Sequence, residues 1–199
     1  MMMKKLPGSW SLPALVAAAA LLAGCGVPPS ATTPAAPAKA STAAVQKAVV
    51  QRVDTYFANE AKAPLGGSYQ ISTAALYKAL QKNPNQFLLL DVRMPSGPAT
   101  APGYAQGHIG GAVNVPYPDL AKNLNKIKKL DQGRPIVTIC YTGQWANQSE
   151  AILRLLGYNA YALHLSMSDW NQKTDILPPK HTVPNYPLVT GTKPGTFKP

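Results

Sequence analysis

The sequence has few cysteines, few histidines and few acidic residues. Its 199 residues include two cysteines, three histidines, and eight Asp or Glu against 19 Lys or Arg. Because the cysteines are Cys25 and Cys140, the chain has no Cys-x-x-Cys motif, which excludes a thioredoxin-type dithiol cycle within one chain. His164 and His181 lack the spacing of metal ligands. We therefore expect neither a metal site nor a bound cofactor.

Long apolar runs are also scarce, and the main one lies near the N-terminus. The run from Leu12 to Leu22 follows two lysines and is too short to span a membrane comfortably. It leads into Leu22-Ala23-Gly24-Cys25, which resembles the lipobox of bacterial lipoprotein signal peptides. The resemblance implies a signal peptide at 1–24, lipidation of Cys25, and an extracytoplasmic protein anchored to a membrane of the cell envelope. The alternative is an ordinary cleaved signal peptide.

If Cys25 carries lipid, Cys140 has no cysteine with which to form a disulfide within the chain.

The formal net charge of +11 would ordinarily suggest a nucleic-acid partner. The predicted location outside the cytoplasm argues against nucleic acid. A basic surface beside an anionic membrane, or one that attracts small anions such as thiosulfate, fits this location, and simple solubility is the alternative.

The composition changes along the N-terminal third of the chain. Residues 25–41 are rich in Pro and Ala and have almost no large apolar side chains, which predicts a tether without a core. In residues 42–63, valine or phenylalanine recurs every fourth residue from Val45 to Phe57, which predicts an amphipathic helix. We expect its apolar face to pack on the chain's own domain, and binding of a protein partner is the alternative.

Residues 68–171 have the pattern of one compact domain. Buried strands are predicted where apolar residues run together, at 87–92, 112–116, 136–139 and 160–163. Helical patterns are found between or beside them, at 74–81, 120–130 and 147–156. This order is typical of an α/β domain with a mainly parallel central sheet flanked by helices, here preceded by an extra N-terminal helix. The proline-rich residues 172–199 predict a tail or wrapping segment without regular structure.

The chain is organised around the stretch from Cys140 to Trp145. The cysteine directly follows the predicted strand 136–139 and precedes a helix, so we expect it on a short loop at the carboxyl end of a strand. The N–H groups of such a loop and the N-terminus of the next helix favour an anion. They therefore favour a thiolate over a thiol, and would also hold a persulfide. The alternative is a structural cysteine that fills space at the strand end.

Several blocks of the sequence resemble rhodanese-like domains, the sulfurtransferase family. They are Leu89-Leu90-Asp91-Val92-Arg93, Tyr104 to Pro116, Cys140 to Gln144, Leu155 to Tyr158 and Met167 to Trp170. Each block is a weak signal alone, but together they follow the order and spacing of the family from residue 70 to residue 171. The resemblance implies a single rhodanese-like α/β domain at 68–171.

The resemblance also implies a reaction. The Cys140 thiolate would attack the outer sulfur of a small donor anion such as thiosulfate, release sulfite and keep a persulfide, from which a thiol or similar acceptor takes the sulfur. The charge on the persulfide would be stabilised by the loop N–H groups of Tyr141, Thr142, Gly143, Gln144 and Trp145. Asp91, Arg93 and His108 would support the site. We expect a salt bridge between Asp91 and Arg93 that pins the loops, and a structural role for His108 rather than general-base catalysis.

The sequence departs from the family pattern at the cysteine loop. Trp145 stands where the loop usually has an arginine that helps to bind the anionic donor, and a tryptophan cannot replace a bidentate cation. Leu165 and Ser166 stand where the family often has two glycines, and we expect them to narrow the pocket. Ala146 replaces the arginine of the Cys-x-x-x-x-x-Arg motif of the phosphatase relatives, which argues against phosphatase activity. A sulfurtransferase, a weakly active or inactive binding or scaffold protein, and a redox sensor therefore stay open.

Overall fold

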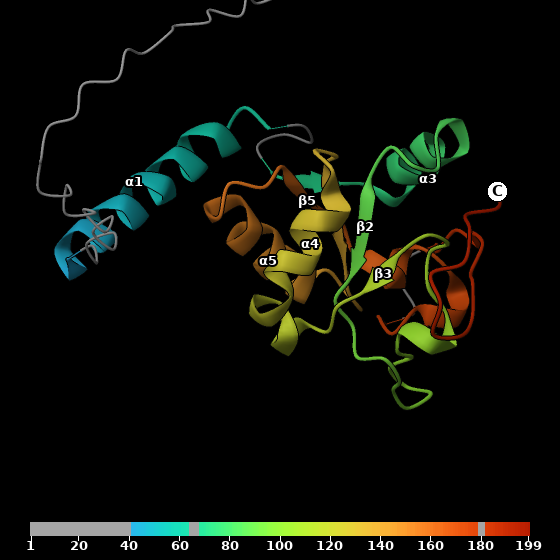
Figure 1. The fold of residues 1–199 in the computed structure, drawn as a ribbon. Helices are drawn as coiled ribbons and strands as arrows, with labels where there is room; N and C mark the ends of the chain where they lie inside the picture. Colours follow the sequence, from blue (N-terminus) through green and yellow to red (C-terminus); the bar gives the residue numbers. More distant parts are fainter. Residues whose placement is uncertain (1–40, 64–67, 179–181) are drawn as a thin grey trace, which may run out of the picture. The chain divides into compact units, whose positions relative to one another are not determined.

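The computed structural model describes residues 41–63, 68–178 and 182–199. In this part of the chain five parallel strands form one sheet in the order β1-β5-β4-β2-β3 (Figure 1). The strands are β1 (Gln70–Ile71), β2 (Leu88–Asp91), β3 (Val113–Asn114), β4 (Ile136–Ile139) and β5 (Ala160–Leu163). The α-helices are α1 (Thr42–Glu60), α3 (Thr73–Lys82), α4 (Leu124–Asp131) and α5 (Gln144–Leu155). The predicted signal peptide, Cys25 and all but the last residue of the tether lie outside the described residues.

The two central strands, β2 and β4, place the cysteine loop at one edge of the sheet. Their register pairs Leu90 with Thr138 and Asp91 with Ile139, so both strands end at the same level. Because all the strands are parallel, the segments that follow β2 and β4 leave the sheet side by side. Cys140 and Arg93 therefore emerge next to each other.

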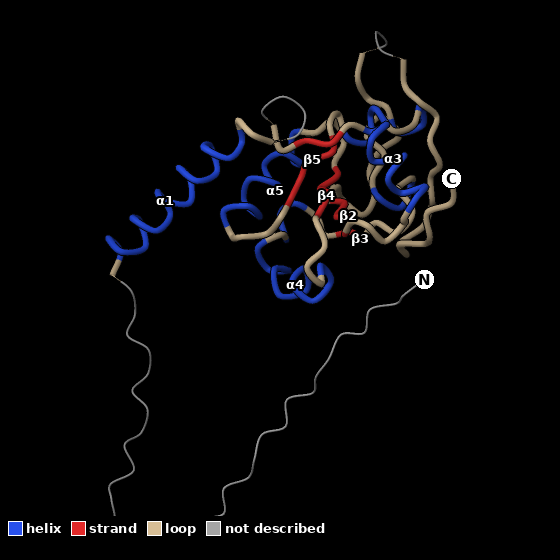
Figure 2. Tube along the Cα trace, turned by 90° about the horizontal axis from the view of Figure 1, so that it is seen from above, coloured by secondary structure: helices blue, strands red, loops and turns tan. Residues whose placement is uncertain are grey.

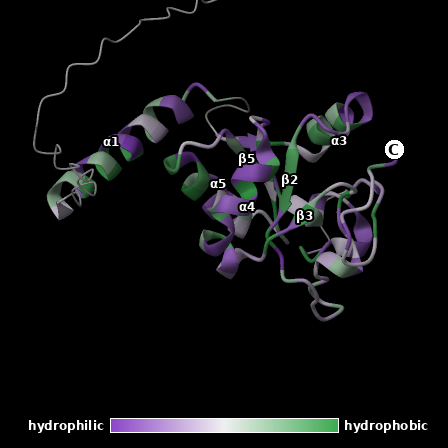
Figure 3. Ribbon diagram, viewed as in Figure 1, coloured by the Kyte–Doolittle hydropathy of each residue, from purple (hydrophilic) through white to green (hydrophobic). Residues whose placement is uncertain are grey.

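Both faces of the sheet are covered, as expected for a parallel sheet. Side chains alternate along β2 and β4, so that Leu89 and Val137 lie in one apolar cluster while Leu88 and Ile136 lie in the other. The first cluster includes side chains of α3, and the second includes side chains of α4 and α5. Figure 2 shows these helices on opposite sides of the strands. In Figure 3, β2 is hydrophobic over most of its length, which fits a strand buried on both faces.

Local signals explain most of the element boundaries. The Ser72 hydroxyl accepts a hydrogen bond from the Ala75 N–H at 3.2 Å and starts α3 at Thr73. Helix α5 starts at Gln144, three residues before the predicted start, because Gly143 adopts a left-handed conformation (φ 99°) and turns the chain directly into the helix. The helix predicted at 120–130 divides into a 3-10 turn and α4. Strand β1 was not predicted, since two residues show no periodicity.

Helix α1 forms as predicted, and its apolar face is turned toward the chain's own domain, but this face is not buried. None of its residues is buried, and Val45, Val49 and Phe57 are 50%, 51% and 62% exposed. Val45 and Val49 nevertheless share one side of α1 and line an apolar groove with Ile152, Leu155 and Leu156 at the C-terminal end of α5. Within residues 41–63, 68–178 and 182–199, no helix combines the length and hydropathy that crossing a membrane requires.

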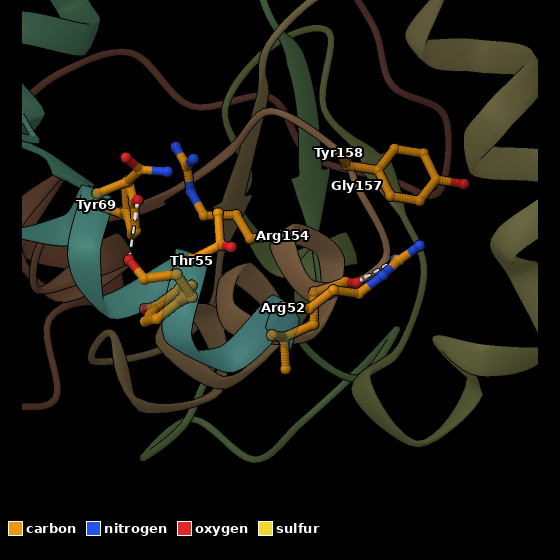
Figure 4. A pocket seen from close by; sticks show the side chains of 9 residues that line it. Arg52, Thr55, Tyr69, Arg154, Gly157 and Tyr158 are labelled. Atoms are coloured by element: carbon orange, nitrogen blue, oxygen red, sulfur yellow. Dashed lines mark hydrogen bonds between the residues drawn. The ribbon is translucent and has the colours of Figure 1, made fainter. Parts of the chain in front are cut away.

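Polar groups also attach α1 to α5. The Arg52 guanidinium donates a hydrogen bond to the carbonyl oxygen of Leu155, and the Tyr56 hydroxyl donates one to Glu150. Beside these contacts lies a pocket of ≈ 270 Å³ (Figure 4). There the Arg154 guanidinium stacks 3.4 Å from the centre of the Tyr69 ring. This end of the junction is therefore polar and partly charged, whereas the groove beside Val45 and Val49 is apolar.

The C-terminal segment wraps over the face of the sheet that α3 covers. The Tyr186 ring stacks on Tyr77 with 4.1 Å between centroids, and Phe197 is only 8% exposed within the apolar cluster of that face. Its pairing with the rest of the chain includes a single antiparallel bridge between His108 and Val189. The predicted wrapping segment is therefore present, with only this bridge and a 3-10 turn at Gln172–Thr174 as regular structure among its described residues.

Candidate active site

Cys140 lies on a four-residue loop between β4 and α5. The loop ends at Gly143, whose left-handed conformation is unfavourable for other residues. A Cβ atom at this position would also lie 3.4 Å from the backbone nitrogen of Leu165, so the loop and the segment after β5 approach closely. The predicted position of the cysteine, at the carboxyl end of a central strand and before a helix, is confirmed.

The sulfur of Cys140 receives a backbone hydrogen bond. The Gly143 N–H donates to Sγ at 3.1 Å. The N–H of Cys140 itself donates to the Ser166 hydroxyl at 3.1 Å, and the Cys140 carbonyl oxygen accepts from the N–H of Met167. The backbone of Cys140 is thus bound to the segment that follows β5, and its Sγ accepts from the Gly143 N–H within the loop. Of the five loop N–H groups predicted to stabilise a sulfur anion, that of Gly143 makes this contact.

A pocket of ≈ 240 Å³ opens above the loop. Its lining residues come from three separate segments of the chain: Ala101, Cys140, Tyr141, Thr142, Gln144, Trp145 and Ile176. Cys140 is only 2% exposed, so solvent and reactants reach its sulfur through this pocket. Leu165 and Ser166 do not line the pocket, and the prediction that they narrow it is wrong. The Ser166 side chain instead binds the backbone of Cys140 from the buried side.

Trp145 is half-buried and forms an aromatic wall of the pocket. Its ring stacks on Tyr117 with 5.3 Å between centroids and an interplanar angle of 11°. Tyr141 meets the same indole edge-on, at 5.7 Å and 70°. Such pairs are stabilising and restrict the ring to one orientation. Trp145 therefore neither seals the pocket nor moves freely within it.

The expected salt bridge between Asp91 and Arg93 is confirmed. Both side chains are fully buried, and an Arg93 Nη atom lies 2.7 Å from an Asp91 carboxylate oxygen. The guanidinium also donates to the carbonyl oxygens of Pro102 and Gly107, which fixes the connection between β2 and β3 at two points. Its central carbon lies 5.8 Å from the centre of the Tyr141 ring. The Arg93 guanidinium thus lies next to Tyr141 of the cysteine loop, and its hydrogen bonds go to Asp91 and to backbone carbonyl oxygens of the domain.

His108 has the structural role that the sequence predicts. It is fully buried and stacks on Tyr104, and its ring nitrogens lie 3.0 Å from the Tyr104 carbonyl oxygen and 3.3 Å from that of Pro194. Its backbone exchanges two hydrogen bonds with Val189. The imidazole therefore fastens the C-terminal segment and makes no recorded contact with the Cys140 loop.

Three residues of the site were missed by sequence reasoning. Tyr117 supports the loop through Trp145, while Ala101 and Ile176 line the pocket. Ala101 belongs to the long connection after β2, and Ile176 follows the last blocks that resemble the family. Nothing in their local sequence marks them, because only the fold brings them to Cys140.

A model of the rhodanese-like domain family matches residues 72–173, just over half of the chain. The chain belongs to the rhodanese-like domain family. No protein among the curated sequences matches it. The assignment agrees with the parallel sheet and with the cysteine loop at its edge.

Solved structures of similar proteins include several related to rhodanese. A rhodanese-related protein from Thermoplasma volcanium is 24% identical, with 49% of this chain and 85% of that one covered and a TM-score of 0.39. A rhodanese-like domain protein from Staphylococcus aureus is 18% identical, with coverage of 58% and 98% and a TM-score of 0.41. A protein from Lactobacillus plantarum is 26% identical, with coverage of 61% and 88% and a TM-score of 0.40. The family assignment rests on the match to the family model.

Proposed function

We propose that this rhodanese-like protein is a sulfurtransferase that carries sulfur as a persulfide on Cys140. The observation that supports the proposal most directly is the hydrogen bond from the Gly143 N–H to Sγ, on a loop that opens into a pocket. A donor fixed at this position stabilises negative charge on sulfur without reorganisation during the reaction. The N-terminus of α5, which begins at the next residue, adds to the same potential.

The proposed reaction has two displacement steps. The Cys140 thiolate attacks the outer sulfur of the donor, and a new S–S bond forms as the S–S bond of the donor breaks. With a thiosulfate-like donor, the leaving group is sulfite. A thiol acceptor, as its thiolate, then attacks the outer sulfur of the persulfide and regenerates the Cys140 thiolate. Neither step needs an external oxidant or reductant.

Mass spectrometry of the intact protein tests the proposal. We expect the reduced, full-length chain in detergent to gain one sulfur atom on exposure to a sulfane-sulfur donor, and to lose it again on addition of a thiol. Cys140→Ser should abolish the gain, while Cys25→Ser should leave it unchanged. If no donor adds sulfur to Cys140 in a chain shown to be folded, the proposal is wrong.

Scaffolding or partner binding is the alternative function. It is favoured by Trp145, which occupies the place of the family's loop arginine and is held by Tyr117 and Tyr141. A protein partner would then contact the mouth of the pocket. Under this alternative a Cys140→Ser variant keeps near-normal function in the cell, whereas a sulfurtransferase loses it.

We also propose that the mature protein is anchored to a bacterial membrane, outside the cytoplasm, through lipidated Cys25. The proposal is supported by the sequence Leu22-Ala23-Gly24-Cys25 after an apolar run. Metabolic labelling with a fatty acid should mark the wild-type chain and not the Cys25→Ser variant. Label in both chains, or in neither, would contradict lipidation at Cys25.

A further inference from the structure

Among the residues that the structure describes, none that lines the pocket above Cys140 has a charged side chain. Four of the seven lining residues are apolar or aromatic, namely Ala101, Tyr141, Trp145 and Ile176. Thr142 and Gln144 are polar but uncharged. This composition contrasts with the chain as a whole, in which 19 residues are Lys or Arg. Within the described part of the chain, no side-chain cation therefore lines the place where a small, doubly charged donor would react.

A guanidinium does lie behind the pocket wall, but each of its three nitrogens already donates a hydrogen bond within the fold. Arg93 contacts the Tyr141 ring and is fully buried. Its hydrogen bonds go to Asp91 and to two carbonyl oxygens, and Asp91 balances its charge. A dianion in the pocket would lose much of its hydration without gaining an ion pair, which is unfavourable.

The walls of the pocket suit an organic group instead. Trp145 is fixed by two tyrosines and remains half-buried, so part of the indole is available for contact. Ile176 and Ala101 add aliphatic surface from segments outside the cysteine loop. The volume of ≈ 240 Å³ is below the range of about 300–1,000 Å³ usual for drug-sized ligands, which favours a small organic molecule.

We propose that the sulfur donor of Cys140 is an organic sulfane-sulfur compound, whose apolar or aromatic group rests on Trp145. This inference rests on the proposed sulfur transfer and names the substrate class of the same site. In the reaction with an organic thiosulfonate, R–SO₂–S⁻, the Cys140 thiolate attacks the outer sulfur. A new S–S bond forms on Cys140, the donor's S–S bond breaks, and the sulfinate R–SO₂⁻ leaves with the electron pair. Trp145 acts as the residue that determines specificity.

Three stable donors separate the effects of charge and of the organic group. Benzenethiosulfonate and methanethiosulfonate each have one negative charge and differ in the apolar group, while thiosulfate has two charges and no organic group. The rate of sulfur gain on Cys140 is measured for each donor with the full-length chain in detergent. Each rate is divided by the rate of the same donor with a free small thiol, which removes differences in intrinsic reactivity.

We expect the normalised rate for benzenethiosulfonate to exceed that for thiosulfate by roughly tenfold or more, with methanethiosulfonate between them. Trp145→Arg should raise the thiosulfate rate and lower the benzenethiosulfonate rate, which reverses the preference. Ala101→Lys introduces a cation from a different segment and leaves the aromatic wall intact. It should raise the thiosulfate rate alone, and it serves as the second variant if Trp145→Arg does not fold.

Two different failures can be told apart. If none of the three donors adds sulfur to Cys140, the proposed sulfur transfer itself is wrong. If thiosulfate reacts as fast as benzenethiosulfonate after normalisation, or if Trp145→Arg and Ala101→Lys leave the preference unchanged, sulfur transfer stands and the inference about the donor is overturned.

Discussion

Arg93 and Asp91 form a fully buried ion pair next to the cysteine loop. Removing one partner of such a pair leaves an uncompensated charge in the interior. We therefore expect Arg93→Met to lower the free energy of unfolding by about 3–5 kcal/mol, because Asp91 loses its partner while the volume is largely kept. Unfolding in urea, followed by tryptophan fluorescence, measures the change.

Lys122→Met is the matched control. Lys122 also pairs with an aspartate, Asp119, but the two side chains are 79% and 44% exposed. An exposed pair of this kind contributes about 0–1 kcal/mol. Equal losses of unfolding free energy in the two variants would show that burial does not determine how much the Arg93–Asp91 ion pair contributes to stability.

Leu165 and Ser166 show how a departure from a family pattern can be accommodated. Both adopt left-handed conformations, with φ values of 48° and 50°, where the family often has glycine. This conformation costs a residue other than glycine roughly 1–2 kcal/mol. Ser166 offsets part of the cost because its hydroxyl accepts from the Cys140 N–H and donates to the Leu163 carbonyl oxygen. The sequence indicated the unusual position, but not that the side chain would support the loop.

At the scale of elements, α5 joins the site to the N-terminal helix. Its first residues follow the cysteine loop, and Glu150 in its middle contacts Tyr56 of α1. Burial raises the pKa of Glu150 from its ordinary value to about 7, and the charge of Glu60 adds to the shift. The Tyr56 hydroxyl and the Arg154 guanidinium oppose it. Arg154 Nε lies 2.9 Å from a Glu150 oxygen but is not aligned for a hydrogen bond.

The raised pKa of Glu150 predicts that the stability of the folded chain depends on pH. Between about pH 4.5 and pH 7, the folded chain keeps a proton on Glu150 that the unfolded chain releases. The free energy of unfolding therefore falls as the pH rises through this window, and the contribution of Glu150 is constant above it. We expect Glu150→Gln to reduce the decrease in Tm between about pH 5 and about pH 8. Calorimetry of both chains at the two pH values measures this difference.

Asp54→Asn is the control for that experiment, since Asp54 lies on α1 and is exposed. It should change Tm by similar amounts at both pH values. A Glu150→Gln chain with the same pH dependence as the wild type would contradict the assigned pKa of Glu150.

The elements that the sequence predicted well are those with a strong local signal. The strands Ile136–Ile139 and Ala160–Leu163 agree residue for residue with the prediction, because their apolar runs are bounded by turns. The helix from Thr42 was also predicted, whereas its polar contacts were not. They depend on Arg52 and Tyr56, whose partners lie about a hundred residues away in sequence.

At the scale of the whole molecule, some residues of the site could be predicted from the sequence and others could not. Cys140 and its loop could be found from the sequence because strand, loop and helix are consecutive. Tyr117 and Ile176 could not, since they reach the pocket only through the crossovers of the sheet and the path of the C-terminal segment. Ile176 lines the pocket and Tyr117 stacks on Trp145, so the sequence identified Cys140 and Trp145 but not the rest of the pocket wall and its support.

The C-terminal segment lies beyond the family match, which ends at residue 173, yet it completes the core. Phe197 and Val183 are 8% and 7% exposed, and Tyr186 covers Tyr77. A chain that ends after residue 174 loses this burial. Each buried side chain of this size contributes about 1.5–3 kcal/mol, so we expect the unfolding free energy to fall by at least about 3 kcal/mol in urea.

Gly110→Ala tests the same packing without shortening the chain. Its added Cβ would overlap with the Thr196 carbonyl oxygen and lie 2.6 Å from the Phe197 backbone, so the segment must move. Hydrogen exchange should then increase in residues 182–199 and stay unchanged in β2 and β4, because the substitution does not touch the central strands. If the shortened chain and Gly110→Ala are both as stable as the wild type, the family domain folds without its C-terminal segment and this segment is only a surface cover.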